Sequence, residues 1–117
     1  MKGYETICIL HPDLTEDQVK ESVDVYTKII TDDGGEVHKS DIWGLKKLAY
    51  QVKGNPRGYF VYLLYAAKSD TIRELERILR ITDTNIRYMT VRVMSIEETL
   101  KDKPQLLDDP TLTIQDG

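Results

Sequence analysis

Side chains able to carry catalytic or metal chemistry are few and poorly grouped in this sequence. Cys8 is the only cysteine, and it lies inside an expected strand, so we interpret it as a small buried residue and not as a nucleophile. The two histidines, His11 and His38, lie at no metal-ligand spacing with each other or with Cys8. The glycines match neither a P-loop nor a dinucleotide fingerprint. We therefore expect no enzyme, no metal site, no cofactor and no small-molecule substrate.

A basic pair is the most suggestive chemical feature. Lys46-Lys47 stands just after Trp43-Gly44, an interruption typical of a bulge in a strand. Taken alone, such a pair also fits an edge strand that is protected by lysine. Phosphate binding needs only positioned cations, with aromatic rings nearby to stack or to bond to a sugar. Further candidates for RNA contacts are Arg87 and Arg92 on the last expected strand, and Lys2 and Tyr4 at the start of the first.

The distribution of charge removes an apparent objection to nucleic-acid binding, which is the net charge of −4. Residues 1–38 carry three lysines against nine carboxylates, and residues 97–117 carry two against six. Residues 39–96 carry eleven Lys and Arg against five carboxylates. A polyanion responds to the local field of such a basic segment. An acidic chain is therefore compatible with RNA binding.

Hydrophobic periodicity and turn residues predict six elements. Strands are expected at 4–10, 36–52, 59–65 and 85–94, with residues 53–58 forming a hairpin loop. Thr15 and Gln18 have the form of a capping box that opens a helix of about 18 residues, and Ser69 is expected to cap a second helix. The longest apolar run, from 59 to 67, is far shorter than the roughly 20 residues that span a bilayer, so we expect a cytoplasmic protein without a membrane segment.

The order strand, helix, strand, strand, helix, strand predicts an α+β, ferredoxin-like split βαβ fold. Four antiparallel strands then carry both helices on one face, with a domain over residues 1–95. Residues 96–117 form an acidic tail with too little apolar surface to fold alone. The helix-free face is expected to be partly apolar, since every position from 59 to 65 is apolar. It is either a partner surface or a face shielded by the tail or carrying scattered apolar residues.

Several blocks of the sequence resemble the bacterial small-subunit ribosomal protein S6 family over about residues 1–95. The most specific block is Trp43-Gly44-x-Lys46-Lys47-Leu48-Ala49-Tyr50. Other matching blocks are Tyr4-Glu5, Ile9-Leu10-x-Pro12-x-Leu14, Gly34-Gly35-Glu36-Val37, Gly58-Tyr59-Phe60 and Arg87-Tyr88-x-Thr90-Val91-Arg92.

This resemblance implies a ribosome-bound structural protein. The family binds the central domain of small-subunit ribosomal RNA together with ribosomal protein S18, and it is not enzymatic. The resemblance carries the RNA contacts to Lys2, Tyr4, Lys46, Lys47, Arg87 and Arg92. Tyr59 and Phe60 on the sheet, with Leu106 and Leu107 in the tail, are expected to form the surface for the protein partner.

Two other functions fit the same topology. A ligand-sensing regulatory module would bind its ligand at a dimer interface. A small acyl-phosphate hydrolase would need an arginine in the loop after the first strand, and residues 11–14 contain neither Arg nor Lys.

Overall fold

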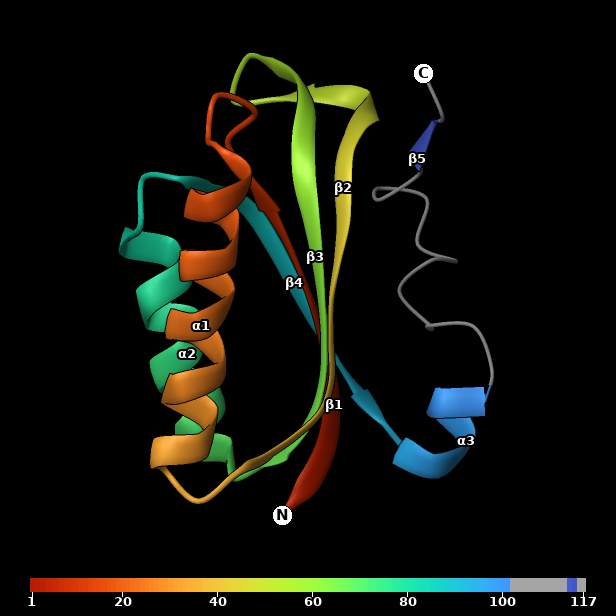
Figure 1. Ribbon diagram of the computed structural model, residues 1–117. Helices are drawn as coiled ribbons and strands as arrows, with labels where there is room; N and C mark the ends of the chain where they lie inside the picture. The colour runs from red at the N-terminus through yellow and green to blue at the C-terminus, as the bar shows by residue number, and fades with distance from the viewer. Residues whose placement is uncertain (102–113, 116–117) are drawn as a thin grey trace.

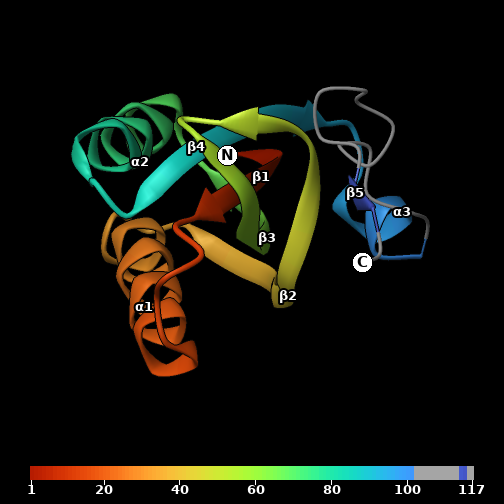
Figure 2. The same cartoon turned by 90° about the horizontal axis from the view of Figure 1, so that it is seen from above.

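The computed structural model describes residues 1–101 and 114–115 as a sheet with two long helices on one face (Figures 1 and 2). Neighbouring strands are antiparallel throughout, in the order β4-β1-β3-β2-β5. Strands β4-β1-β3-β2 and the two long helices form the predicted ferredoxin-like split βαβ fold, and that prediction is confirmed. The short strand β5, which pairs with β2 at Lys47 and Leu48, is not expected from the sequence. The elements are β1 (Lys2–Leu10), α1 (Glu16–Asp32), β2 (Glu36–Val52), β3 (Asn55–Ala67), α2 (Ser69–Ile81), β4 (Asn85–Val93), α3 (Ile96–Lys101) and β5 (Ile114–Gln115).

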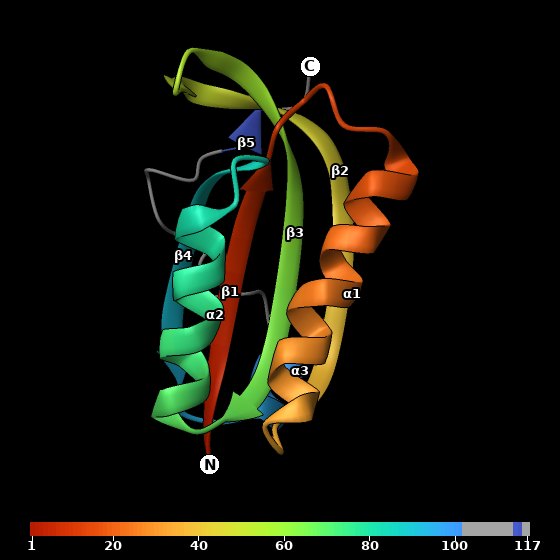
Figure 3. The ribbon, with the colours of Figure 1, turned by 90° about the vertical axis from the view of Figure 1, so that its left-hand side faces the viewer.

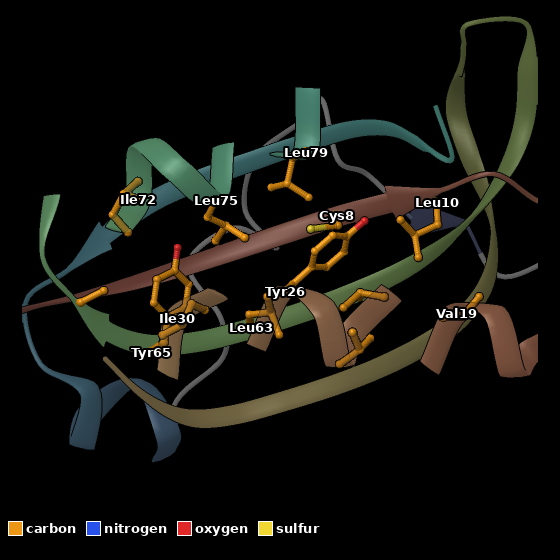
Figure 4. Close-up of a cluster of buried hydrophobic side chains, with 13 residues drawn as sticks. Cys8, Leu10, Val19, Tyr26, Ile30, Leu63, Tyr65, Ile72, Leu75 and Leu79 are labelled. Carbon is orange, nitrogen blue, oxygen red and sulfur yellow. The ribbon is translucent and has the colours of Figure 1, made fainter. Parts of the chain in front are cut away.

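The main core lies between the two long helices and the sheet (Figure 4). Tyr26 and Ile30 of α1 and Leu75 of α2 pack against side chains from β1 and β3. Cys8 has no exposed area in this layer, so the sequence prediction of a buried cysteine is confirmed. Burial raises the pKa of its thiol to about 12, which keeps the sulfur protonated and unreactive.

The two long helices begin in different ways. The capping box predicted for α1 is present, because Thr15 accepts from the backbone of Gln18 and the Gln18 side chain accepts from the backbone of Thr15. The predicted cap of α2 by Ser69 is wrong. Lys68 is the N-cap residue, and its carbonyl already accepts from the backbone of Thr71. Ser69 is thus already inside the helix, and α2 has no side-chain cap.

The hairpin between β2 and β3 departs from the predicted loop over residues 53–58. Val52 pairs directly with Asn55, so the turn consists of Lys53 and Gly54 alone. Both residues have positive φ, of 49° and 79°, which is the conformation that a two-residue hairpin turn requires. Both strands therefore extend to the turn, but their register shifts between Lys47 and Val52, so the end of the hairpin is irregularly paired. The interruption predicted at Trp43-Gly44 is confirmed, since the register shifts between Ile42 and Gly44 and Gly44 has a φ of 95°.

A short helix, α3, follows β4 and is not expected from the sequence. Ser95 precedes it, and its hydroxyl accepts from the backbone of Glu98. Ile96 packs against the helix-free face of the sheet. Leu106 and Leu107 lie outside the residues that the structure describes. Within the described residues, no helix is both long enough and apolar enough to cross a membrane.

Candidate RNA-binding and partner-binding surfaces

The basic pair lies on β2 beyond the bulge, and its two lysines belong to opposite faces of the sheet. Lys46 is opposite Gly58, and Lys47 is opposite Arg57. A Cβ atom at Gly58 would meet Ile9 of the helix-free face, so Lys46 is placed on that face and Lys47 on the other. Lys47 is exposed and Lys46 is half-buried.

The two arginines of β4 are also on opposite faces. Arg87 is opposite Ile9, whose side chain belongs to the helix-free cluster. Arg92 is opposite Tyr4, which packs against the main core on the helix side. Five residues separate the arginines, or about 17 Å along a strand. They therefore cannot serve a single phosphate.

The six predicted RNA contacts thus form two groups at the two ends of the strands. The hairpin-end group consists of Lys46, Lys47 and Arg87. The N-terminal-end group consists of Lys2, Tyr4 and Arg92. Because their members also lie on both faces of the sheet, the two groups do not form one continuous basic patch.

Tyr4 is less available for base stacking than the sequence suggests. Its ring stacks on Tyr65 of β3 with centroids 6.1 Å apart and an interplanar angle of 28°. The hydroxyls of Tyr65 and Thr6 are hydrogen bonded at 2.7 Å, which fixes that ring in the core. One face of Tyr4 is therefore already covered, and its remaining exposed part is suited to a sugar or phosphate contact.

The predicted partner-surface residues Tyr59 and Phe60 do not lie side by side. Phe60 has no exposed area and packs in the helix-free cluster, so it cannot contact a partner directly in this conformation. Tyr59 is half-buried on the helix side. Adjacent strand residues point to opposite faces, so the two residues cannot both belong to one face.

The helix-free face carries a second apolar cluster. Its buried members are Ile7, Ile9, Leu48, Phe60, Tyr62, Leu64, Ile86 and Val93. Trp43, Val52 and Ile96 pack against this cluster from β2 and α3. The face is therefore partly covered by the protein itself, as in the shielded alternative that the sequence leaves open, and Ile96 belongs to the segment expected to be a tail.

A hollow lies between α1 and strand β2. It has a volume of about 500 Å³ and is lined by Lys20, Val23, Asp24, Ser40, Asp41, Ile42 and Trp43. A neighbouring hollow of about 460 Å³ continues along β2 to Leu45 and Tyr59. Ile42 and Leu45 are 41% and 43% exposed there. Sequence reasoning misses this groove, although two apolar residues on an outer strand are its signal.

The described part of the chain contains no candidate metal centre. Its His, Cys, Asp and Glu side chains form no group of three that could hold a metal ion. His11 accepts from the backbone of Asp13 at 3.1 Å, which is the role of a residue at a strand end. The two groups of cations and the apolar groove beside β2 suit macromolecular binding.

Comparison with known proteins decides the family. Residues 3–92 match the ribosomal protein S6 family. This chain belongs to the ribosomal protein S6 family of the small ribosomal subunit. The family resemblance stated from the sequence is thereby confirmed.

Two curated relatives and one solved structure are similar to this chain over nearly their whole length. The small ribosomal subunit protein bS6 of Caldanaerobacter subterraneus subsp. tengcongensis is 40% identical over 92 residues, which are 79% of this chain and 97% of that protein. The bS6 protein of Clostridium botulinum strain Loch Maree is 42% identical over 91 residues, covering 78% and 97%. The crystal structure of 30S ribosomal protein S6 from Thermotoga maritima has a TM-score of 0.77 at 27% identity, covering 86% of this chain and 94% of that one.

Proposed function

We propose that this S6 chain is a structural, non-enzymatic part of the cytoplasmic small ribosomal subunit, where it binds the central domain of the ribosomal RNA together with ribosomal protein S18. The observation that most supports the proposal is the family match over residues 3–92. The surplus of cations in residues 39–96 agrees with a contact to phosphates.

The split of the cations into two groups favours a composite RNA surface. The hairpin-end and N-terminal-end groups hold five cations between them, spread over two faces and two ends of the sheet. Because few of these cations can contact one stretch of RNA at the same time, we expect this chain alone to bind RNA with low affinity. A basic partner that docks on this acidic chain would add cations between the groups and steer assembly through complementary charge.

The part of the molecule best suited to S18 is the groove between α1 and β2. Ile42 and Leu45 leave apolar area exposed there, and Asp41 and Asp24 supply negative charge. Asp41 already has Lys39 at 3.4 Å, so a partner cation would share this carboxylate. Leu106 and Leu107 extend the proposed partner surface beyond the described residues. Deletion of residues 96–117 without any loss of S18 affinity would contradict that extension.

The RNA contacts are tested by removing charge from the basic pair. The full chain is titrated with a fragment of the central domain in the presence of S18, as wild type and as Lys46→Gln/Lys47→Gln. Arg80→Gln on α2 is the matched control, because Arg80 is an exposed cation of the helix layer. We expect the double variant to bind more weakly and with a shallower salt dependence, by about 0.7–0.9 in log-log slope for each phosphate that is no longer neutralised. Equal affinities for all three proteins would contradict the assignment of these lysines.

A further inference from the structure

The hairpin arm, which we define as residues 46–58, projects at the end of the sheet opposite to the N-terminus (Figures 1 and 3). It holds the end of β2, the turn and the start of β3. Its charged residues are all cations, namely Lys46, Lys47, Lys53 and Arg57. In a chain with more carboxylates than cations, such a segment needs an explanation beyond folding.

Two cations of the arm face each other across the hairpin. Lys47 and Arg57 are directly opposed in the β2–β3 register, and both are exposed. Like charges in this position destabilise a strand pair. Within the described residues, neither side chain has a carboxylate at ion-pair distance. The hairpin keeps an unfavourable pair that a bound polyanion would make favourable.

A third cation, Lys53, lies in the turn, where it must adopt an unfavourable backbone conformation. Lys53 has a φ of 49°, a region that L residues with long side chains rarely adopt. The turn is held by Gly54 and by Asn55, whose side chain donates to the carbonyls of Val52 and Lys53 at 3.3 and 3.2 Å. The Lys53 side chain makes none of these bonds. Glycine or asparagine would suit the turn better, so the fold does not account for a lysine there.

An exposed aromatic ring accompanies these cations. Tyr50 is 73% exposed, and it lies three residues from both Lys47 and Lys53. Proteins that bind unpaired nucleotides combine cations along the backbone with aromatic rings on which bases stack. The arm offers both elements within a few residues.

We propose that the hairpin arm is a second RNA-contacting element, in which Tyr50 stacks on an unpaired base while Lys53 and the Lys47–Arg57 pair bind the flanking phosphates. This inference rests on the proposed function, that the chain binds ribosomal RNA. It adds Tyr50, Lys53 and Arg57 to the RNA contacts, and it specifies a loop or single strand as the ligand.

The test titrates the central-domain fragment with the full chain and S18 at about 50 and about 200 mM salt. The variants are Lys53→Gly, Arg57→Gln and Tyr50→Ser, with Arg80→Gln as the control cation outside the arm. Each cation variant is expected to reduce the magnitude of the log-log salt slope by about 0.7–0.9. Tyr50→Ser is expected to weaken binding by roughly 5- to 150-fold and to leave the slope unchanged.

A purely structural role of these residues predicts a different outcome. Lys53→Gly places glycine where φ is positive, and Arg57→Gln removes the repulsion with Lys47. Both variants should therefore be at least as resistant to urea as the wild type while their RNA affinity falls. Loss of affinity that only follows a loss of stability would overturn the inference.

The remaining outcomes separate this inference from the proposed function. Wild-type binding with all three arm variants equal to Arg80→Gln would overturn the inference and leave the proposed function intact. A loss of S18 affinity measured without RNA would assign the arm to a protein contact and overturn the inference. Absence of wild-type binding to a competent RNA fragment would overturn both.

Discussion

Trp43 lies flat on Tyr62, with ring centroids 5.3 Å apart and planes within 9° of parallel. The bulge next to Trp43 places it over the helix-free face, where Tyr62 is buried and donates a hydrogen bond to the buried carboxylate of Glu5. Burial, followed by the Glu5 carboxylate, raises the pKa of the Tyr62 phenol and keeps it a donor. The hydrogen bond between Tyr62 and Glu5 is thus buried on the helix-free face, where Trp43 stacks on the Tyr62 ring.

Removal of the Tyr62 hydroxyl should destabilise the protein. Tyr62→Phe keeps the stack with Trp43 but withdraws a donor from a buried carboxylate, which costs about 1–3 kcal/mol. Glu5→Gln keeps an acceptor for the phenol and should cost less. Urea unfolding of both variants measures the difference. A loss for Tyr62→Phe no larger than that for Glu5→Gln would contradict this role of the hydroxyl.

A hydrogen bond between the helices should also contribute to stability. The buried Thr71 hydroxyl near the start of α2 donates to Asp33, the C-cap residue of α1. Thr71→Val removes that donor at nearly constant volume and should lower the free energy of unfolding by about 1–3 kcal/mol. Thr71→Ser keeps the hydroxyl and is the control. A Thr71→Ser loss equal to that of Thr71→Val, measured by urea denaturation, would argue against the hydrogen bond.

Much of the fold is predictable because its signals are local. The capping box at Thr15 and the bulge at Gly44 each depend on a few neighbouring residues. The predicted hairpin turn is wrong because Pro56 and Gly58 suggest a loop, whereas the Val52–Asn55 pairing closes the turn earlier. The predicted cap at Ser69 is wrong by one position, because a serine in the first turn of a helix gives the same local pattern as a serine at its N-cap.

The candidate surfaces are less predictable, for a physical reason. A sequence identifies cations but does not show which of them share a face, since one bulge changes the alternation of side chains. Arg87 and Arg92, five positions apart on β4, lie on opposite faces as regular alternation already indicates, whereas the faces beyond the bulge at Gly44 depend on where that bulge falls. Burial of Phe60 depends on coverage by other parts of the fold, which no local pattern reports.

Two glycine substitutions should lower the free energy of unfolding for different reasons, one because a side chain has no space and the other because the backbone has a positive φ. A Cβ atom at Gly58 would lie 2.4 Å from Cγ2 of the fully buried Ile9, so Gly58→Ala forces the core apart and should cost about 1–3 kcal/mol. Gly44 has open space but a φ of 95°, so Gly44→Ala should cost about 1–2 kcal/mol through its backbone alone. The further change Ile9→Ala removes Cγ2, which Ile9→Val would keep. Compared with its cost in the wild type, Ile9→Ala should recover stability in Gly58→Ala and not in Gly44→Ala. Recovery in both, or in neither, would contradict the assignment.

Stability should fall in alkaline solution because of Cys8. The folded thiol has its pKa raised from 9.0 to about 12, so above pH 9 the unfolded chain loses a proton that the folded chain keeps. The unfolded state then binds fewer protons, and the free energy of unfolding decreases with pH by up to about 1.4 kcal/mol per unit from this group. Urea unfolding between pH 8 and 10 should show a weaker decrease for Cys8→Ala than for the wild type, and identical slopes would refute the contribution of the thiol.

The most direct test of the central claim is the affinity of the full chain for a central-domain RNA fragment, measured with and without S18 at about 50 and about 200 mM salt. We predict tight binding only with S18 and, for four to six phosphate contacts from this chain, a contribution to the log-log salt slope of about −3 to −5. Binding that is unaffected by S18 would contradict the composite surface. No binding by a folded chain, to an RNA fragment that still binds its other protein partners, would contradict the ribosomal function itself.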